Sequence, residues 1–219
     1  MEICDIGIRG FEDTLAFQLE MLKKRIDGDI PDTLIIVEHP SVITLGRRSL
    51  EENIIDRAYF EGKNIPIVLT GRGGEVTCHS PGQIVCYPII DLKNIGKDIA
   101  GYIDFLEVTV SAALNEIGVN AGRVDGKRGV WTQGKKIAFI GIAIKKWVTY
   151  HGVAVNVNNS LEPFLKIHPC GHKEIEVTSV MQQLGKTTDI NGVKEALAEK
   201  FISGIEGTVG IKQKQGVSA

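Results

Sequence analysis

One cysteine of this chain stands in a setting that favours chemical reactivity. Cys170 lies between a proline and a glycine, outside any stretch with helical or strand periodicity, so we expect it on a rigid turn. A cysteine attacks as the thiolate, and a thiolate forms readily only beside a cation or an imidazole. The residues that could supply such a group are therefore the first to consider.

Two histidines flank this cysteine and allow a second interpretation. His168 and His172 each stand two residues from Cys170, which gives the spacing His-x-Cys-x-His. Zinc uses these ligand types, but three ligands so close in an extended chain rarely surround one tetrahedral ion. We expect no metal here, and a metal-binding or scaffold domain stays as the non-enzyme alternative.

A pair of lysines could supply the cation instead. Lys135 and Lys136 open the apolar stretch 136–141. They form either a solvated basic turn or, if the strand faces a pocket, the positive charge that a thiolate needs. Further along, His151 and Gly152 interrupt a β-rich run, and a lone histidine there is more often structural than catalytic.

The segment 72–83 is the third candidate for chemistry. Its glycines would let the backbone approach a ligand, and Arg72 could hold an anion through its planar guanidinium. A tight loop with a satisfied surface arginine is the alternative. The segment is no dinucleotide fingerprint, because Val76 breaks the glycine spacing, and Val180 likewise rules out a phosphate-binding loop before residues 185–187.

The composition limits the classes of protein that remain. The chain has 219 residues, 43% apolar and 24% charged, with a formal net charge of −2, which is typical of an ordered globular protein without a nucleic-acid or membrane partner. Its four cysteines include no CxxC pair, so a disulfide framework is not indicated. No secretory signal and no membrane-length apolar run is readable, and we expect a cytoplasmic protein.

Mixed strands and helices must position these residues. Apolar periodicity predicts one helix from Phe11 to a stop at Gly28 and another from Asp98 to Gly118, with a last helix around Leu197. Strands are predicted at 3–8, 33–37, 42–45, 65–69 and 84–90, then a hairpin within 129–157, with Cys4 and Cys86 as small core residues. We therefore expect an α+β fold, a single domain over 1–219 with a mixed, largely antiparallel sheet, packed helices and a flexible tail at about 212–219.

Taken in order, these pieces resemble the lipoyl(octanoyl) transferase family. The resemblance runs over nine segments: 34–46, 72–79, 81–83, 87–92, 129–131, 136–141, 151–156, 169–171 and 177–179. Each segment alone is weak evidence, but their shared order and spacing are specific. The resemblance implies the α+β catalytic domain of biotin and lipoate protein ligases and an octanoyltransferase activity without a cofactor.

The resemblance also implies roles for individual residues. Cys170 matches the family's nucleophile, which takes the octanoyl group as a thioester, and Lys136 matches the lysine that lowers the thiol pKa and moves protons. The implied acyl-binding residues are Arg72, Gly73, Gly74, Glu75, Val76, Thr77, Cys78, His79, Phe139, Ile140, Gly141, Gly152, Val153 and Ala154. Backbone N–H groups of the glycine-rich loop would form an oxyanion hole.

The implied partners are proteins. Octanoyl-acyl carrier protein would be the donor, and the lipoyl domains of 2-oxoacid dehydrogenase complexes and the glycine cleavage H protein would be the acceptors. Cys78 and Ser80 depart from the Tyr and Gly that are common in the family and could change the width of the acyl pocket. A lipoate-protein ligase, which would need a nucleotide, and a cysteine acyl hydrolase stay as the alternative enzymes.

Overall fold

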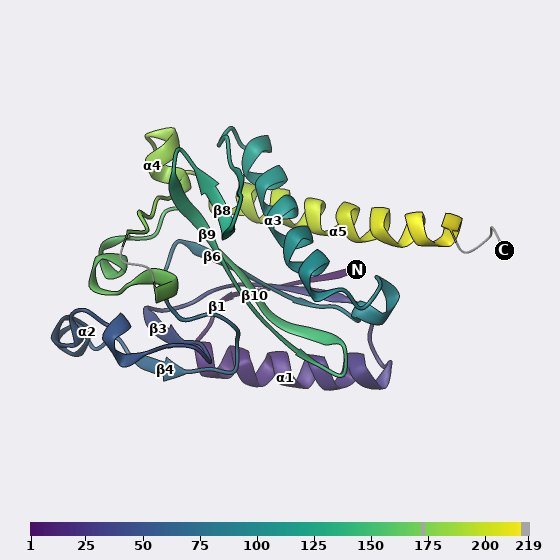
Figure 1. Ribbon diagram of the computed structural model, residues 1–219, viewed down its shortest axis with the longest axis horizontal. Coiled ribbons are helices and arrows are strands. Elements are labelled where there is room, and N and C mark those ends of the chain that lie inside the picture. The colour runs from purple at the N-terminus through teal and green to yellow at the C-terminus, as the bar shows by residue number, and fades with distance from the viewer. Residues whose placement is uncertain (172–173, 216–219) are drawn as a thin grey trace.

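The computed structural model describes residues 1–171 and 174–215, with side chains described as far as residue 207. It is an α+β fold built on two sheets (Figure 1). The strands are β1 Glu2–Ile8, β2 Thr33–Glu38, β3 Val42–Leu45, β4 Ile67–Leu69, β5 Val76–His79, β6 Gln83–Ile89, β7 Gly122–Val124, β8 Lys127–Thr132, β9 Lys135–Lys145 and β10 Val148–Asn156. The α-helices are α1 Phe11–Asp27, α2 Arg57–Gly62, α3 Ile99–Glu116, α4 Val180–Leu184 and α5 Ile190–Gln215.

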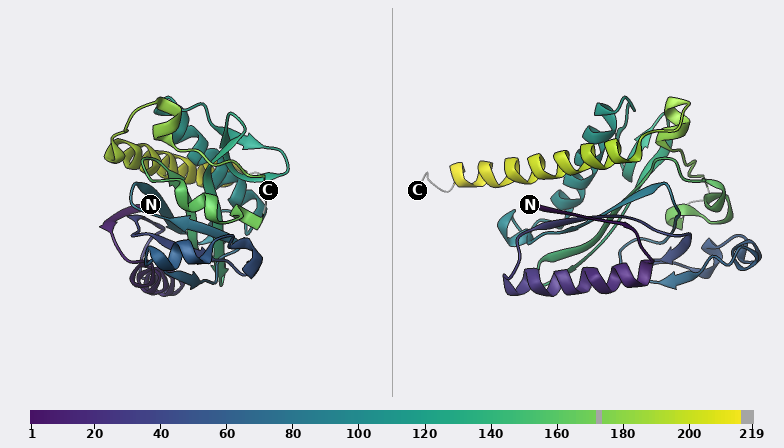
Figure 2. Two further views of the ribbon diagram at one scale, coloured as in Figure 1. Left: turned by 90° about the vertical axis from the view of Figure 1, so that its left-hand side faces the viewer. Right: turned by 180° about the vertical axis from the view of Figure 1, so that it is seen from behind.

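The larger sheet has the strand order β1-β2-β6-β10-β9-β8-β7, and the smaller one has the order β4-β3-β5. Only β1–β2 and β3–β4 pair in parallel, so the expected mixed and largely antiparallel sheet is confirmed. Helix α1 covers one face of the large sheet, and α3 and α5 cover the other (Figure 2).

The central strands are apolar on both faces because both faces are covered. On β2, Leu34 and Ile36 enter the core under α3 and α5, whereas Ile35 and Val37 enter the core under α1. This alternation is the ordinary two-residue period of a strand. It explains why the sequence of β2 reads as an uninterrupted apolar run.

Local signals fix the ends of several elements. Gly28 adopts φ 86° and ends α1, and the Asp98 side chain accepts a hydrogen bond from the Gly101 N–H at the start of α3. The predicted β9–β10 hairpin is confirmed. Lys146 and Trp147 form its two-residue turn with φ 51° and 69°, the left-handed values that a tight hairpin turn requires.

The structure also departs from the sequence-based expectations. The turn at Pro40 separates strands of two different sheets, and the short helices α2 and α4 were not predicted. Cys86 is fully buried as expected, but Cys4, on the edge strand β1, is only half-buried. Helix α5 includes residues 212–215 of the expected flexible tail, and 216–219 lie outside the described residues. Within the described chain, we find no helix with the length and apolarity to cross a membrane.

Candidate active site

Cys170 lies on a tight turn that forces an unusual backbone conformation. The turn spans Pro169–Gly171, and Cys170 adopts φ 56° and ψ 24°. A non-glycine residue in this left-handed region is strained by about 1–2 kcal/mol, so the surrounding contacts must hold it there. The Gly171 N–H donates to the His168 carbonyl at 2.9 Å, and the His168 N–H donates to the Asn53 carbonyl at 2.8 Å.

Glu75 packs against the far side of this turn. A Cβ atom on Gly171 would lie 1.6 Å from Glu75 Oε2, so the carboxylate occupies the space that a side chain would need. Asn53 Nδ2 donates to the same Oε2 at 3.1 Å. Asn53 therefore holds the turn twice, through its own carbonyl and through Glu75.

Lys136 brings a buried ammonium to the thiol. Its Nζ donates to Cys170 Sγ at 3.3 Å, and its side chain is 3% exposed. The Nζ also lies over the rings of Trp131 at 5.4 Å and Phe139 at 4.9 Å, which favours a cation. No carboxylate of the described residues pairs with Lys136, whereas its neighbour Lys135 pairs with Glu176 at 2.9 Å.

The backbone of Lys136 is fixed from the neighbouring segment. Its N–H donates to the Glu176 carbonyl at 2.8 Å, and its carbonyl accepts from the Thr178 N–H at 3.0 Å. The lysine therefore sits on a strand paired on both sides. The thiol lies on a strained turn. The fold brings strand β9 and this turn together although Lys136 and Cys170 are 34 residues apart in the sequence.

Gly129 provides the space for the lysine side chain. It adopts φ 100°, and a Cβ there would lie 2.6 Å from Lys136 Cε and 3.1 Å from Nζ. Its N–H donates at 2.7 Å to the carboxylate of Glu107, a buried residue of α3 that also accepts from Arg123 Nε at 3.0 Å. The buried carboxylate of Glu107 on α3, paired with the partly exposed Arg123 on β7, thus holds the glycine under the ammonium.

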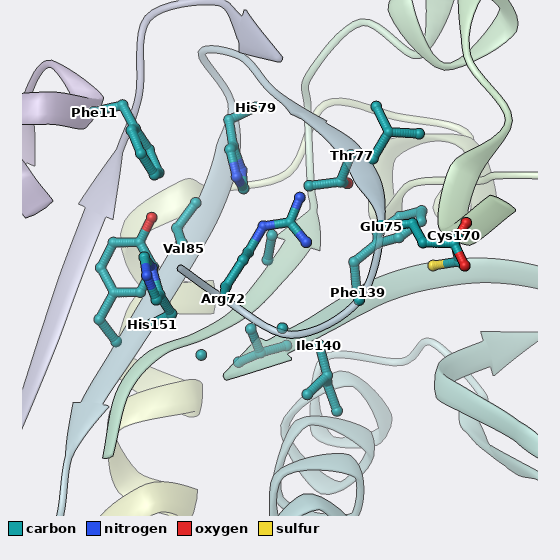
Figure 3. A pocket seen from close by; sticks show the side chains of 17 residues that line it. Phe11, Arg72, Glu75, Thr77, His79, Val85, Phe139, Ile140, His151 and Cys170 are labelled. Atoms are coloured by element: carbon teal, nitrogen blue, oxygen red, sulfur yellow. The ribbon is translucent and has the colours of Figure 1, made fainter. Parts of the chain in front are cut away.

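A narrow cavity of about 40 Å³ begins at Cys170 (Figure 3). Cys170 and Glu75 lie at one end of it, and Phe11 and His151 lie at the other. The predicted acyl-binding residues that line it are Arg72, Gly74, Glu75, Val76, Thr77, His79, Phe139, Ile140, Gly141, Gly152, Val153 and Ala154. The lining is mostly apolar, as a slot for an alkyl chain requires.

Glycines keep the strands beside the cavity in close contact. Gly141 and Gly152 are register partners on β9 and β10. A Cβ on Gly152 would meet the Cys86 carbonyl oxygen at 2.2 Å, and one on Gly141 would meet Arg72 Cδ at 3.1 Å. Neither position has room for a side chain.

The end of the cavity remote from Cys170 carries buried polar groups that stay uncharged. Burial lowers the pKa of His151 to about 3 and holds the pKa of His79 well below its ordinary value. Burial likewise raises the pKa of Tyr87, whose hydroxyl contacts the ring of His39 at 2.9 Å. Neutral groups fit an apolar ligand better than charged ones would.

Arg72 is used differently from the sequence-based expectation. Its Nη2 donates to the Thr44 carbonyl at 2.6 Å and to Thr44 Oγ1 at 2.9 Å, and its Nη1 donates to the Gly73 carbonyl at 3.1 Å. The planar fork therefore holds strand β3 rather than presenting itself to an anion. Burial lowers the pKa of Arg72 to about 10, still high enough for a cation near neutral pH.

Two residues predicted to bind substrate do not line the cavity. The Gly73 N–H donates to the Ile142 carbonyl at 2.8 Å, so it is not available to an oxyanion. On β5 the Cys78 side chain lies on the face opposite to Thr77 and His79, because side chains alternate along a strand, and it does not line the cavity. It packs in an apolar group that we call the small-sheet cluster: Ile43, Phe60, Val76, Cys78, Phe139, Phe164 and Ile167.

The sequence-based interpretation also missed four lining residues: Phe11, Val85, Tyr87 and His151. Phe11 lies on α1, and the apolar spacing of this segment predicted only that Phe11 belongs to a helix. Tyr87 and His151 lie in segments that carry the family resemblance, so that signal was present. The described residues contain no group of three side chains suited to a metal ion, and His172 lies outside them.

Comparison with known proteins agrees with this geometry. The lipoyl protein ligase A/B catalytic domain family matches residues 11–202. The octanoyltransferase of Geobacter metallireducens is 41% identical over 201 residues, covering 92% of both chains, and that of Caldicellulosiruptor saccharolyticus is 42% identical over 205 residues, covering 92% of this chain and 87% of its own. The chain belongs to the lipoyl(octanoyl) transferase family. It is therefore an acyltransferase for octanoyl transfer in protein lipoylation.

Solved structures show the fold of this family member at lower identity. Lipoate-protein ligase A bound with ATP superposes with a TM-score of 0.75 at 17% identity, covering 94% of this chain and 86% of its own. The biotin protein ligase of Aquifex aeolicus gives a TM-score of 0.58 at 13% identity, covering 96% and 71%. The expected likeness to these ligase catalytic domains is confirmed.

Proposed function

We propose that this octanoyltransferase family member moves the octanoyl group through Cys170. The donor would be octanoyl-acyl carrier protein, and the acceptor would be a lysine of a lipoyl domain, in 2-oxoacid dehydrogenase complexes or the glycine cleavage H protein. The observation that carries the proposal is the 3.3 Å contact between Lys136 Nζ and Cys170 Sγ at the end of an apolar cavity. A thiol in contact with a buried lysine is the arrangement that nucleophilic catalysis by cysteine uses.

In the first half-reaction the Cys170 thiolate attacks the carbonyl carbon of the donor thioester. A bond forms between Sγ and the acyl carbon, and the bond from that carbon to the donor sulfur breaks. The departing thiolate takes a proton from the Lys136 ammonium, which leaves a neutral amine beside the new thioester. Lys136 thus changes from the partner of a thiolate to a general base.

In the second half-reaction a neutral acceptor lysine attacks the same acyl carbon. A carbon–nitrogen bond forms, and the bond to Cys170 Sγ breaks. The proton lost by the attacking nitrogen passes to Lys136, and the thiolate–ammonium pair is restored. No nucleotide enters either step, which separates this proposal from a ligase.

The narrow cavity would hold the alkyl tail during both steps. Each methylene removed from water contributes about 0.8 kcal/mol, so an apolar slot binds an eight-carbon chain well without a charged contact. Phe139 lies at the thiol end of this slot and stacks on Phe164 with ring centroids 5.0 Å apart. Such a stack would hold the wall of the slot in place during transfer.

An ATP-free transfer assay tests this proposal. The chain is incubated with labelled octanoyl carrier protein and a lipoyl domain, beside a lipoyl domain whose acceptor lysine is replaced by arginine. We expect the label on the lysine-bearing domain alone. Transfer that requires ATP would indicate a ligase, and release of free octanoate at the same rate without the acceptor would indicate a hydrolase.

A further inference from the structure

A second cavity lies beside Cys170. Its volume is about 480 Å³, far larger than the 40 Å³ of the narrow cavity. Among the described lining residues, Cys170 alone belongs to both cavities. The thiol is therefore the wall between a narrow apolar space and a wide one.

The wide cavity differs from the narrow one in charge. Lys127, Arg128 and Lys136 line it, against the single carboxylate of Glu174. Arg128 is already paired with Asp104 at 2.5 Å and with Glu107 at 3.5 Å, and Lys136 is committed to the thiol. Among the described lining residues, Lys127 is the cation that has neither a carboxylate partner nor a contact with the thiol.

Lys127 is held over the aromatic wall of this cavity. Its Nζ lies 5.3 Å from the centroid of the Trp131 ring, and Lys136 Nζ lies 5.4 Å from the ring of the same residue. Trp131 is 5% exposed, and its Nε1–H has no acceptor among the described residues. An exposed cation and an unused donor thus belong to residues that line one cavity beside the nucleophile.

We propose that the wide cavity receives the arm of the donor thioester, a long amide-bearing thiol that ends in a phosphate, as in phosphopantetheine. This inference rests on the proposed function. Lys127 would contact the phosphate at the outer part of the cavity.

Geometry requires two separate spaces for such a donor. When Sγ bonds to the acyl carbon, that carbon becomes tetrahedral and carries the alkyl tail and the leaving sulfur in different directions. The narrow cavity is too small for both. If the tail enters the narrow cavity, the leaving arm must extend from Cys170 on the side of the wide cavity, past Trp131 toward Lys127.

The same cavity would then admit the acceptor lysine after the arm has left. The two substrates would compete for one entrance, so a high concentration of acceptor would slow acylation of the free enzyme. The phosphate of the arm carries about two negative charges as a monoester and one as a diester, and the ammonium of one lysine can pair with either form.

The test compares two donors that differ only in the phosphate, octanoyl-pantetheine and octanoyl-phosphopantetheine. Intact mass measures the second-order rate constant for acylation of Cys170 in the wild type, in Lys127→Ala and in the control Lys145→Ala. Lys145 is an exposed lysine at the end of β9 remote from Lys136. For Lys127→Ala we expect about a tenfold loss with the phosphorylated donor and a change below twofold with the unphosphorylated one. Lys145→Ala should leave both unchanged.

The outcomes separate this inference from the proposed function. An equal loss with both donors, or no loss with either, would overturn the phosphate contact while Cys170 still became acylated. Failure of wild-type Cys170 to react with either donor would contradict the proposed function and this inference together. Octanoyl-coenzyme A and octanoyl carrier protein, tested as two further donors, distinguish a free from a protein-bound source. A slower acylation of Lys127→Ala with both donors supports recognition of the phosphopantetheine arm that they share.

Discussion

Two thiols of this chain pack in the same apolar surroundings but differ in every property that controls reactivity. Cys78 belongs to the small-sheet cluster, and the half-buried Cys170 packs against it. Cys78 lies on the regular strand β5, 1% exposed, and burial raises the pKa of its thiol well above the ordinary value. Cys170 lies on a left-handed turn with an ammonium 3.3 Å away. The comparison teaches that a neighbouring cation and a tight turn, rather than a place in the substrate loop, distinguish the thiol that we propose as the nucleophile.

The two ends of the narrow cavity show the same contrast. At the Cys170 end the buried Lys136 side chain contacts the thiol at 3.3 Å. At the other end His79 and His151 are buried without a carboxylate partner among the described residues, and both are held neutral. The cavity thus has a lysine–thiol contact at one end and neutral histidines at the other.

Removing each thiol in turn gives the largest expected difference. We expect Cys170→Ala to lower octanoyl transfer by on the order of 10⁴-fold, because the thioester intermediate cannot form. Cys78→Ala leaves only a small void in an apolar cluster and should keep transfer within about threefold. Steady-state turnover of matched preparations measures both, and a comparable loss in the two variants would remove the distinction between the thiols.

Removing the cation should make Cys170 behave more like Cys78. Lys136→Met keeps an unbranched side chain without the charge, and we expect transfer to fall by about 10²-fold. The rate of alkylation of Cys170 by iodoacetamide at neutral pH should fall. Lys135→Met, which removes the solvent-facing partner of Glu176, is the control, and an unchanged alkylation profile in Lys136→Met would argue against a role for this ammonium.

Displacing the cation without removing it is a finer version of the same experiment. In Gly129→Ala the new methyl group would overlap both Lys136 Cε and the Ala138 carbonyl oxygen, each 2.6 Å away, so we expect the ammonium and the backbone of β9 to shift and transfer to fall by about tenfold. Gly118→Ala is a matched control, because Gly118 also has a positive φ of 91° but the nearest atom to its added Cβ is 3.9 Å away. Similar losses in both variants would attribute the effect to backbone strain alone.

The neutral histidine at the far end of the cavity should affect the pH dependence of folding stability rather than the transfer activity. The folded-state pKa of His151 is about 3, below the ordinary 6.5, so the unfolded chain takes up the proton first as the pH falls. The histidine contribution is therefore fully present above about pH 6.5 and is lost between there and pH 3, by up to about 1.4 kcal/mol per pH unit for one proton. Unfolding followed at pH 7.5 and 5.0 should show a smaller acid loss for His151→Asn than for the wild type, and identical losses would contradict a neutral buried ring.

Sequence patterns predicted much of this fold because the helices and strands obey their own periodicities. Helices α1 and α3 and the β9–β10 hairpin followed from apolar spacing and turn residues. The division into two sheets did not follow, because β2 and β3 are both apolar runs and nothing local shows which partner each will pair with. Tertiary packing decides which sheet each of these two strands joins.

The candidate site was only partly predictable for the same reason. The resemblance brought Cys170 and Lys136 forward, and the structure places them in contact. It could not show that Cys78 packs in the small-sheet cluster instead of lining the cavity, because tertiary packing decides which side chains reach the cavity. Nor could it show that Phe11 on α1 closes the slot, or that Glu107 on α3 holds Gly129 beneath the lysine, because these contacts join distant elements.

Intact mass after incubation with octanoyl carrier protein is the most direct measurement of the central claim, that Cys170 is the acylated residue. The wild type and Cys78→Ala should each gain the mass of one octanoyl group, mapped by peptide analysis to Cys170 and lost on addition of a lipoyl domain. Cys170→Ala should gain nothing. An adduct that persists in Cys170→Ala, or one that maps to Cys78, would contradict the assignment.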